Sequence, residues 1–193
     1  MEPITFIYGW YALAVPPLAF IIYVWRRKNS VAKWPRLGLC SALAVLITMA
    51  LAMWYPVETP MGAISFVDVG VMAVAMTFGP EIGGLAGAFG PALGLFITGG
   101  GPVAVLVLTK GIEGIVTGYV SEKSEGPSGR ILGGVLGGSM AIAITLVLAY
   151  TAGIGDPDAV LSTGLVEVST GIILGTAISG LVKRKVQWTE EVI

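Results

Sequence analysis

The sequence predicts an all-α membrane protein with seven transmembrane helices, and three observations lead to this fold class. Hydrophobic residues make up 55% of the 193 residues and charged residues only 12%, which is far more apolar than a soluble domain. The apolar residues form long runs. Nearly all basic residues fall in three short segments between these runs, 26–36, 123–130 and 183–185. Because short cytoplasmic loops retain Lys and Arg, we expect all three segments on the inner side.

About 20 helical residues cross a hydrocarbon core of ~30 Å, so the apolar runs divide into seven predicted spans. The first run is followed by Arg-Arg-Lys and has no basic residue ahead of it, which predicts a retained span instead of a signal peptide. The third and fourth spans are short, and we expect them to tilt or to be partly re-entrant. The predicted spans are 4–25, 36–54, 65–79, 81–98, 102–121, 130–152 and 159–182.

Alternation of the spans places the N-terminus outside and the C-terminus in the cytoplasm of a cell-membrane protein. The chain then divides into an additional N-terminal helix with its basic inner end (1–28), a six-helix membrane domain (29–186) and a cytoplasmic tail (187–193). The longest predicted outer loop covers 55–64.

The composition excludes several functions. The chain has no histidine and a single cysteine, Cys40, so imidazole or cysteine metal sites, an internal disulfide and His-dependent catalysis are not expected. We therefore predict no metal, no cofactor and no enzyme activity, with Lys110 and Glu113 the only acid-base pair available. The net charge of −1 gives no reason to expect nucleic acid. The phosphate-binding Gly-x-x-x-x-Gly-Lys-Ser/Thr motif is also absent.

The 28 glycines lie mainly within the spans and recur four residues apart. This spacing lets helices approach closely in lipid, either inside the bundle or against another membrane protein. Four such pairs stand out: Gly83 with Gly87, Gly90 with Gly94, Gly114 with Gly118, and Gly134 with Gly138. A separate candidate face for docking a partner protein lies at the inner end of the second span. It consists of Gly38, Ser41, Ala42 and Val45.

Five ionisable residues lie within or at the ends of the apolar runs: Asp68, Glu81, Lys110, Glu113 and Glu167. A charge at the bilayer centre costs ~2.5–3.5 kcal/mol on insertion scales, so each should face protein or a water-filled cavity. Lys110 and Glu113 share a helix face and could neutralise each other or face a ligand. Glu167 has no cationic neighbour in sequence and is a candidate ligand contact, with a protonated or hydrogen-bonded packing role as the alternative.

Asp68 and Glu81 are expected near helix N-termini, where capping or the helix dipole would stabilise a carboxylate. Asp68 is also retained as a candidate ligand contact. The aromatic residues Trp54, Tyr55 and Tyr150 lie at predicted outer ends of spans, where interfacial anchoring is the usual role. The alternative is that they form a lid that stacks on a flat ligand.

From about Arg36 to Lys185 the chain resembles the substrate-binding S components of energy-coupling factor (ECF) transporters. The resemblance rests on an ordered series: Ile-Ser-Phe-Val-Asp-Val-Gly at 64–70, Phe-Gly-Pro-Glu-Ile-Gly-Gly-Leu-Ala-Gly at 78–87, and Lys-Gly-Ile-Glu-Gly at 110–114. Two further spans and a basic C-terminal end follow.

The resemblance implies a six-helix core that captures a vitamin or related micronutrient outside. It also implies partners, a transmembrane T component and two ATPase subunits. In that family the first core helix meets the T component, here through Gly38 and Ala42, and the following loop gates the site, here Trp54 to Ile64. The implied ligand contacts are Lys110, Glu113, Tyr150 and Glu167. The additional span 4–25 departs from the family pattern, and the absence of histidine argues against nickel or cobalt as substrate.

Two other functions remain open at this point. A structural or assembly subunit of a larger membrane complex could keep the fold without the ligand site, and the additional N-terminal helix would give it a new lateral interface. An ion-coupled transporter using Glu113 and Glu167 is less favoured, because the sequence shows no inverted repeat. Two acids, one lysine and several aromatic residues would suit a zwitterionic or cationic heteroaromatic vitamin.

Overall fold

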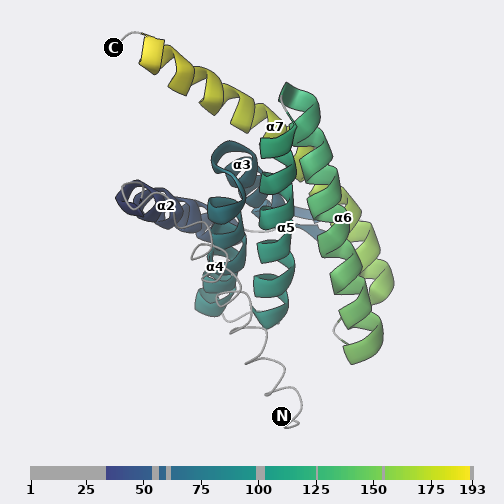
Figure 1. The fold of residues 1–193 in the computed structure, drawn as a ribbon. Helices are drawn as coiled ribbons and strands as arrows, with labels where there is room; N and C mark the ends of the chain where they lie inside the picture. The colour runs from purple at the N-terminus through teal and green to yellow at the C-terminus, as the bar shows by residue number, and fades with distance from the viewer. Residues whose placement is uncertain are drawn as a thin grey trace.

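The computed structural model describes residues 34–53, 57–59, 62–98, 103–124, 126–153 and 155–191. Within these residues the chain forms six helices and one short hairpin (Figure 1). The helices are α2 (Trp34–Met53), α3 (Val67–Phe78), α4 (Pro80–Thr98), α5 (Val103–Lys123), α6 (Gly126–Ala152) and α7 (Pro157–Glu191). The predicted additional span 4–25 lies outside the described residues.

Among the described residues, four helices are long and apolar enough to cross a membrane: α4, α5, α6 and the Pro157–Lys183 part of α7. Helix α3 has 12 residues and is therefore ~18 Å long at 1.5 Å per residue, which is too short to cross alone. The expectation of a short third segment is confirmed, whereas the structure does not confirm seven spans.

The loop between α2 and α3 contains the only strands in the described part of the chain. Strand β1 (Val57–Thr59) pairs antiparallel with β2 (Gly62–Ile64), with Val57 opposite Ile64. The all-α prediction missed this hairpin. A three-residue strand is too short to show the apolar alternation by which strands are recognised.

Helix α3 lies at the centre of the bundle. Its residues from Val67 to Met76 are all buried, because α2, α4, α5 and α7 all pack against it. A helix that is apolar on every side is typical of such a central position. A carboxylate on this helix, such as Asp68, must consequently find its partner within the protein.

The glycine pairs bring neighbouring helices into backbone contact inside the bundle. A Cβ added at Gly114 would collide with the carbonyl oxygen of Gly83, and one added at Gly87 would collide with that of Lys110. These contacts join α4 to α5. Gly90 similarly packs against Thr48 of α2. Close helix packing within the bundle is therefore confirmed as the role of these pairs.

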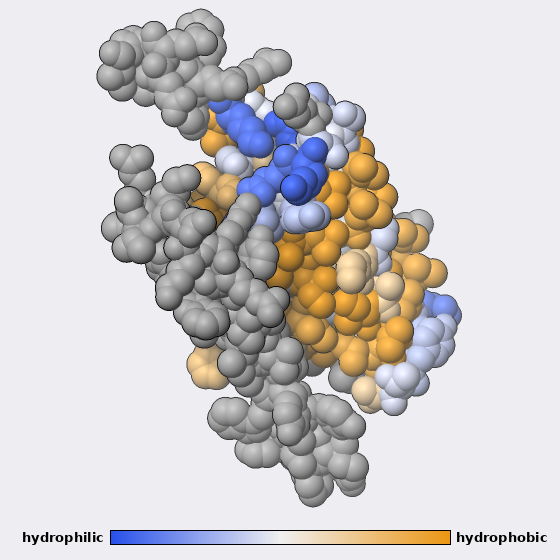
Figure 2. All heavy atoms as spheres, viewed as in Figure 1, coloured by the Kyte–Doolittle hydropathy of each residue, from blue (hydrophilic) through white to orange (hydrophobic). Residues whose placement is uncertain are grey.

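Helix α6 buries its small residues and exposes its large ones. Gly133, Gly134, Gly137, Gly138 and Ala141 are buried. The exposed large residues of this helix are Ile131, Leu132, Val135, Leu136, Met140, Val147 and Tyr150. Figure 2 shows the resulting apolar surface between two hydrophilic ends. This arrangement is expected for a helix that faces lipid on one side and closely packed helices on the other.

The two ends of the bundle differ in their chemistry. The hairpin end carries β1, β2 and the first residues of α3, and β2 also contacts α7. The basic end carries the turn at Gly79, the α5–α6 connection and Lys183. These are close together, because Glu122 lies against Gly79 and Arg130 lies against Gly180.

Candidate functional site

A buried ion-pair cluster joins α3 to α5 in the half of the bundle nearest the hairpin. The ammonium of Lys110 donates hydrogen bonds to Oδ1 of Asp68 and to Oε2 of Glu113, the latter at 2.9 Å. The side chains of Asp68 and Glu113 are 1% and 0% exposed, and that of Lys110 is 12% exposed. Lys110 pairs with Glu113, which was one of the two roles that the sequence left open, and Asp68 joins the pair as a third member.

Glu167 of α7 lies beside this cluster and faces protein. Its Oε1 accepts a hydrogen bond of 2.7 Å from the backbone N–H of Ser65, the residue that follows β2. One helical turn further along α7, Gly171 lies against Asp68, so this face of α7 is directed toward α3.

The local sequence explains how the cluster forms. Lys110 and Glu113 are three residues apart on α5 and so share a face. Asp68 is in the first turn of the central helix α3, and the absence of a side chain at Gly171 allows α7 to approach it. Three helices thus contribute one ammonium and three carboxyl groups.

The cluster has more acceptor capacity than its own donors use. Asp68 Oδ2 and Glu113 Oε1 are buried and have no hydrogen-bond partner among the described residues. Buried acceptors of this kind are costly to leave unsatisfied. Three carboxyl groups also outnumber the single lysine, so the arrangement suits a hydrogen-bond donor or a positively charged group. Among the described residues, no group of three His, Cys, Asp or Glu side chains could hold a metal ion.

Asp68 lies in the first turn of α3, as expected, but it makes no cap hydrogen bond, so the capping part of that expectation is wrong. The N-cap residue of α3 is Phe66, with no side-chain cap hydrogen bond, whereas the Asp68 carboxylate pairs with Lys110. In a buried site a full positive charge is a stronger partner than backbone amides. Glu81 does lie in the first turn of α4, as expected.

Of the three predicted aromatic contacts, Tyr150 is the one that the structure describes, and it does not reach the cluster. Trp54 and Tyr55 lie outside the described residues. Tyr150 is 74% exposed near the end of α6, on the surface instead of between helices. The cavity predicted under the loop 54–64 stays a prediction, because part of that loop lies outside the described residues.

The predicted docking face on α2 is partly accessible. Ala42 is exposed, whereas Ser41 and Val45 are half-buried. The surroundings of Gly38 are not among the described features. Ala44 and Thr48 form the buried side of the helix, and Thr48 donates a hydrogen bond of 2.9 Å to the carbonyl of Ala86 on α4. The face that carries Ala42 therefore points away from the bundle.

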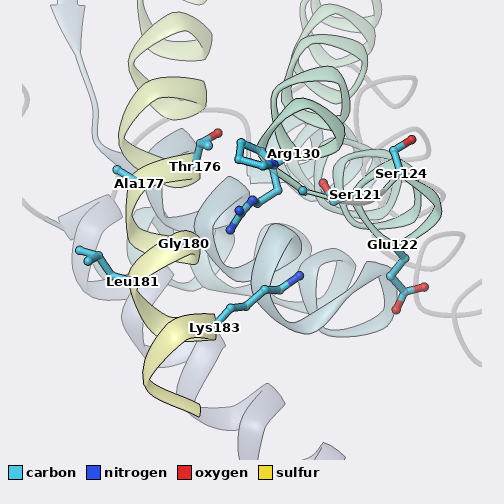
Figure 3. Close-up of a pocket in the computed structure, with 11 residues that line it drawn as sticks. Ser121, Glu122, Ser124, Arg130, Thr176, Ala177, Gly180, Leu181 and Lys183 are labelled. Carbon is cyan, nitrogen blue, oxygen red and sulfur yellow. The ribbon is translucent and has the colours of Figure 1, made fainter. Parts of the chain in front are cut away.

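A pocket that the sequence did not predict lies at the basic end (Figure 3). It has a volume of about 800 Å³ and lies between the α5–α6 connection and α7. Its described lining residues are Ser121, Glu122, Ser124, Gly126, Pro127, Arg130, Thr176, Ala177, Gly180, Leu181 and Lys183. The two basic residues Arg130 and Lys183 could have indicated this pocket in the sequence, but both were interpreted only as markers of membrane topology.

The long apolar helices and their close packing define a multi-pass membrane protein. Residues 28–184 match the family model described as the S component of the ECF-type riboflavin transporter. The chain therefore belongs to this family, which confirms the resemblance seen in the sequence. The predicted span 4–25 lies outside the matched residues.

The chain is also similar to an uncharacterised protein from Pyrococcus woesei, described by its position in a gap 3′ region. The two are 31% identical over 144 residues, which cover 74% of this chain and 97% of that protein.

Proposed function

We propose that this chain is a substrate-capture subunit that binds a small water-soluble nutrient on the outer side of the membrane. A T component and two ATPase subunits would then drive uptake, as the family assignment suggests. The observation that supports this proposal most strongly is the buried cluster of Asp68, Lys110, Glu113 and Glu167. Ionisable residues inside a membrane bundle are costly and typically mark a ligand or ion pathway.

The unsatisfied oxygens indicate what the ligand offers. Lys110 uses Asp68 Oδ1 and Glu113 Oε2, which leaves Asp68 Oδ2 and Glu113 Oε1 without partners among the described residues. A ligand that donates hydrogen bonds, or carries a positive charge, would complete these groups. We therefore propose recognition through ligand donors, with the carboxyl groups as acceptors.

Riboflavin is the first candidate ligand, because the matching family is described by that vitamin. It carries no fixed positive charge, but its ring N–H and ribityl hydroxyl groups are hydrogen-bond donors. A cationic heteroaromatic vitamin such as thiamine would meet the excess of carboxyl groups more directly. The charge pattern supports either ligand, and a competition experiment with riboflavin and thiamine shows which of the two binds more tightly.

Glu167 provides a link between the site and the loop above it. The backbone N–H of Ser65, which directly follows the hairpin, is held by Glu167. We propose that this hydrogen bond fixes the end of the loop Trp54 to Ile64 over the site. A ligand that competes for the Glu167 carboxylate would then change the position of the loop.

Binding measurements on the purified protein test this proposal. Mass spectrometry of small molecules released by denaturation should identify the retained ligand, and titrations with riboflavin and thiamine should give its affinity. Glu167→Gln should weaken binding, whereas Asp158→Asn, a matched change at the exposed start of α7, should not. Absence of any released ligand, together with no binding of either vitamin, would contradict the proposal.

A structural or assembly subunit is the second candidate function. It is favoured by the observation that Lys110 already pairs with two of the three acids, so part of the cluster is stable without ligand. That function predicts stable association with another membrane complex and no ligand binding, which is the opposite outcome of the same titrations.

A further inference from the structure

The pocket at the basic end is lined by two cationic side chains that extend into the same space. Arg130 reaches in from α6 and Lys183 from α7 (Figure 3). Three hydroxyl-bearing residues, Ser121, Ser124 and Thr176, also line it. Its volume of about 800 Å³ is within the usual range of pockets for small ligands.

Arg130 has donors that the described part of the protein does not use. Its Nε and Nη1 atoms are shielded from solvent and have no hydrogen-bond partner among the described residues. Buried N–H groups without acceptors are unfavourable, and the planar set of guanidinium N–H groups matches a phosphate or carboxylate. The Oγ of Ser121, a residue only 7% exposed, is also without a partner there.

Close approach of α7 helps to form this arrangement. Nη1 of Arg130 would lie 3.5 Å from a Cβ added at Gly180. That separation is an ordinary van der Waals contact, so the guanidinium lies beside α7 without crowding it. Arg130 thus crosses from α6 to α7, and within the described part of the chain no ion pair joins it to a carboxylate.

The pocket carries an excess of positive charge. Glu122 is the one carboxylate among its described lining residues, and its carboxylate lies against Gly79. Figure 3 shows it directed away from Arg130 and Lys183. Helix α6 begins at Gly126, at the edge of the pocket, so its first free amides add partial positive charge.

We propose that this pocket binds a phosphate group, supplied either by the headgroup of an anionic lipid or by free phosphate. Leu181 lines the pocket and is exposed, as is Ile178 one turn away, so apolar surface continues from the pocket onto the side of α7. Basic pockets between membrane helices at the cytoplasmic side bind anionic headgroups. The site is distinct from the buried cluster near the hairpin, so the two proposals can fail separately.

The test compares two phosphate sources on the full-length protein. Native mass spectrometry with equal amounts of phosphatidylglycerol and phosphatidylcholine should show preferential retention of phosphatidylglycerol if a lipid supplies the phosphate. Inorganic phosphate, titrated in lipid-free detergent, should raise the melting temperature if the source is free phosphate. In either case Arg130→Gln should weaken binding roughly tenfold, because it removes charge-assisted hydrogen bonds.

Lys123→Gln is the matched control. Lys123 is exposed at the same end of the bundle and does not line the pocket; its ammonium lies 5.8 Å from the ring centre of Tyr119. The control should bind like the wild type, and Arg130→Lys, which keeps the charge, should bind more tightly than Arg130→Gln. Size-exclusion profiles check that each variant is folded. The proposal is overturned if the wild type retains phosphatidylglycerol no better than phosphatidylcholine and inorganic phosphate does not raise its melting temperature. It is also overturned if Arg130→Gln and Lys123→Gln bind equally.

Discussion

Lys110 on α5 is ion-paired with Asp68 on α3, a residue 42 positions earlier in the chain. The pair connects the central helix to a helix that also carries Glu113, and it is almost completely buried. Because α3 is too short to cross a membrane alone, its position depends on contacts with its neighbours. The Lys110–Asp68 pair is therefore part of the proposed ligand site, and it also holds α3 in position against α5.

Replacing Lys110 with Met should destabilise the protein strongly. The change keeps the apolar part of the side chain but leaves the carboxyl groups of Asp68 and Glu113 buried without their cation, and breaking a buried ion pair costs about 3–5 kcal/mol. Thermal unfolding in detergent measures the effect. The control is Lys123→Met, which removes an exposed lysine and should change the stability little. Equal melting temperatures for the two variants would contradict the role of the pair.

Gly114→Ala should also destabilise the bundle, for a steric reason. The added Cβ would collide with the carbonyl oxygen of Gly83, and overpacking of this kind typically costs about 1–3 kcal/mol. Gly180→Ala is the control, because its Cβ would meet only Arg130 Nη1 at 3.5 Å. Alanine loses less backbone entropy than glycine when the chain folds. Gly180→Ala should therefore leave the stability unchanged or raise it by up to about 1 kcal/mol. Similar losses in both variants would contradict the packing argument.

Much of the fold could be predicted from the sequence because membrane helices are constrained by length and charge. The runs that became α4, α5 and α6 agree with the helices to within a few residues. The hairpin at 57–64 could not be predicted, since its strands are only three residues long. The glycine spacing indicated close packing, but only the structure shows that Gly87 meets Lys110 and Gly114 meets Gly83.

The candidate site was predictable as a set of residues but not as an arrangement. Spacing on one helix was enough to pair Lys110 with Glu113. The position of Asp68 in the first turn of α3 was predicted, but its partnership with Lys110 depends on how α3 packs against α5, which no local pattern reveals. Similarly, Arg130 and Lys183 were recognised as basic residues, but the pocket between them depends on the relative positions of α6 and α7.

The predicted orientation can be tested by labelling introduced cysteines. In a Cys40→Ser background, Thr5→Cys should react with an impermeant reagent from the outside, and Gln187→Cys should react only after the membrane is made permeable. The reason is that the basic segments alternate correctly only with a cytoplasmic C-terminus and an odd number of spans. Labelling of both positions from the same side would contradict the predicted seven-span topology.

Ala42→Trp should block assembly with the T component without affecting ligand binding. Ala42 is exposed on the side of α2 that faces away from α4, and small residues allow close approach between membrane helices. Co-purification with the T component and ATPase subunits measures assembly, and titration measures ligand binding. Val147→Trp, on the exposed face of α6, is the control and should assemble normally. Assembly of Ala42→Trp at the wild-type level would exclude this docking face.

Glu167→Gln should weaken ligand binding more than Glu113→Gln. In Glu113→Gln, Lys110 remains paired with Asp68, so the cluster keeps its cation and much of its geometry. Glu167 has no direct cationic contact among the described residues and holds the loop through Ser65. Its carboxylate is thus the acid most available to a ligand, and its loss should reduce affinity roughly tenfold, the effect of one charge-assisted hydrogen bond.

Calorimetric titration of both variants with the identified ligand measures this order, and the melting temperature of each shows whether the fold is intact. A neutral amide at position 167 can still accept the Ser65 hydrogen bond, so a loss of affinity without a loss of stability would assign the effect to the negative charge. If Glu113→Gln were the weaker binder of the two, Glu113 Oε1 would be a more important ligand contact than Glu167, and Glu167 would serve mainly to hold the loop.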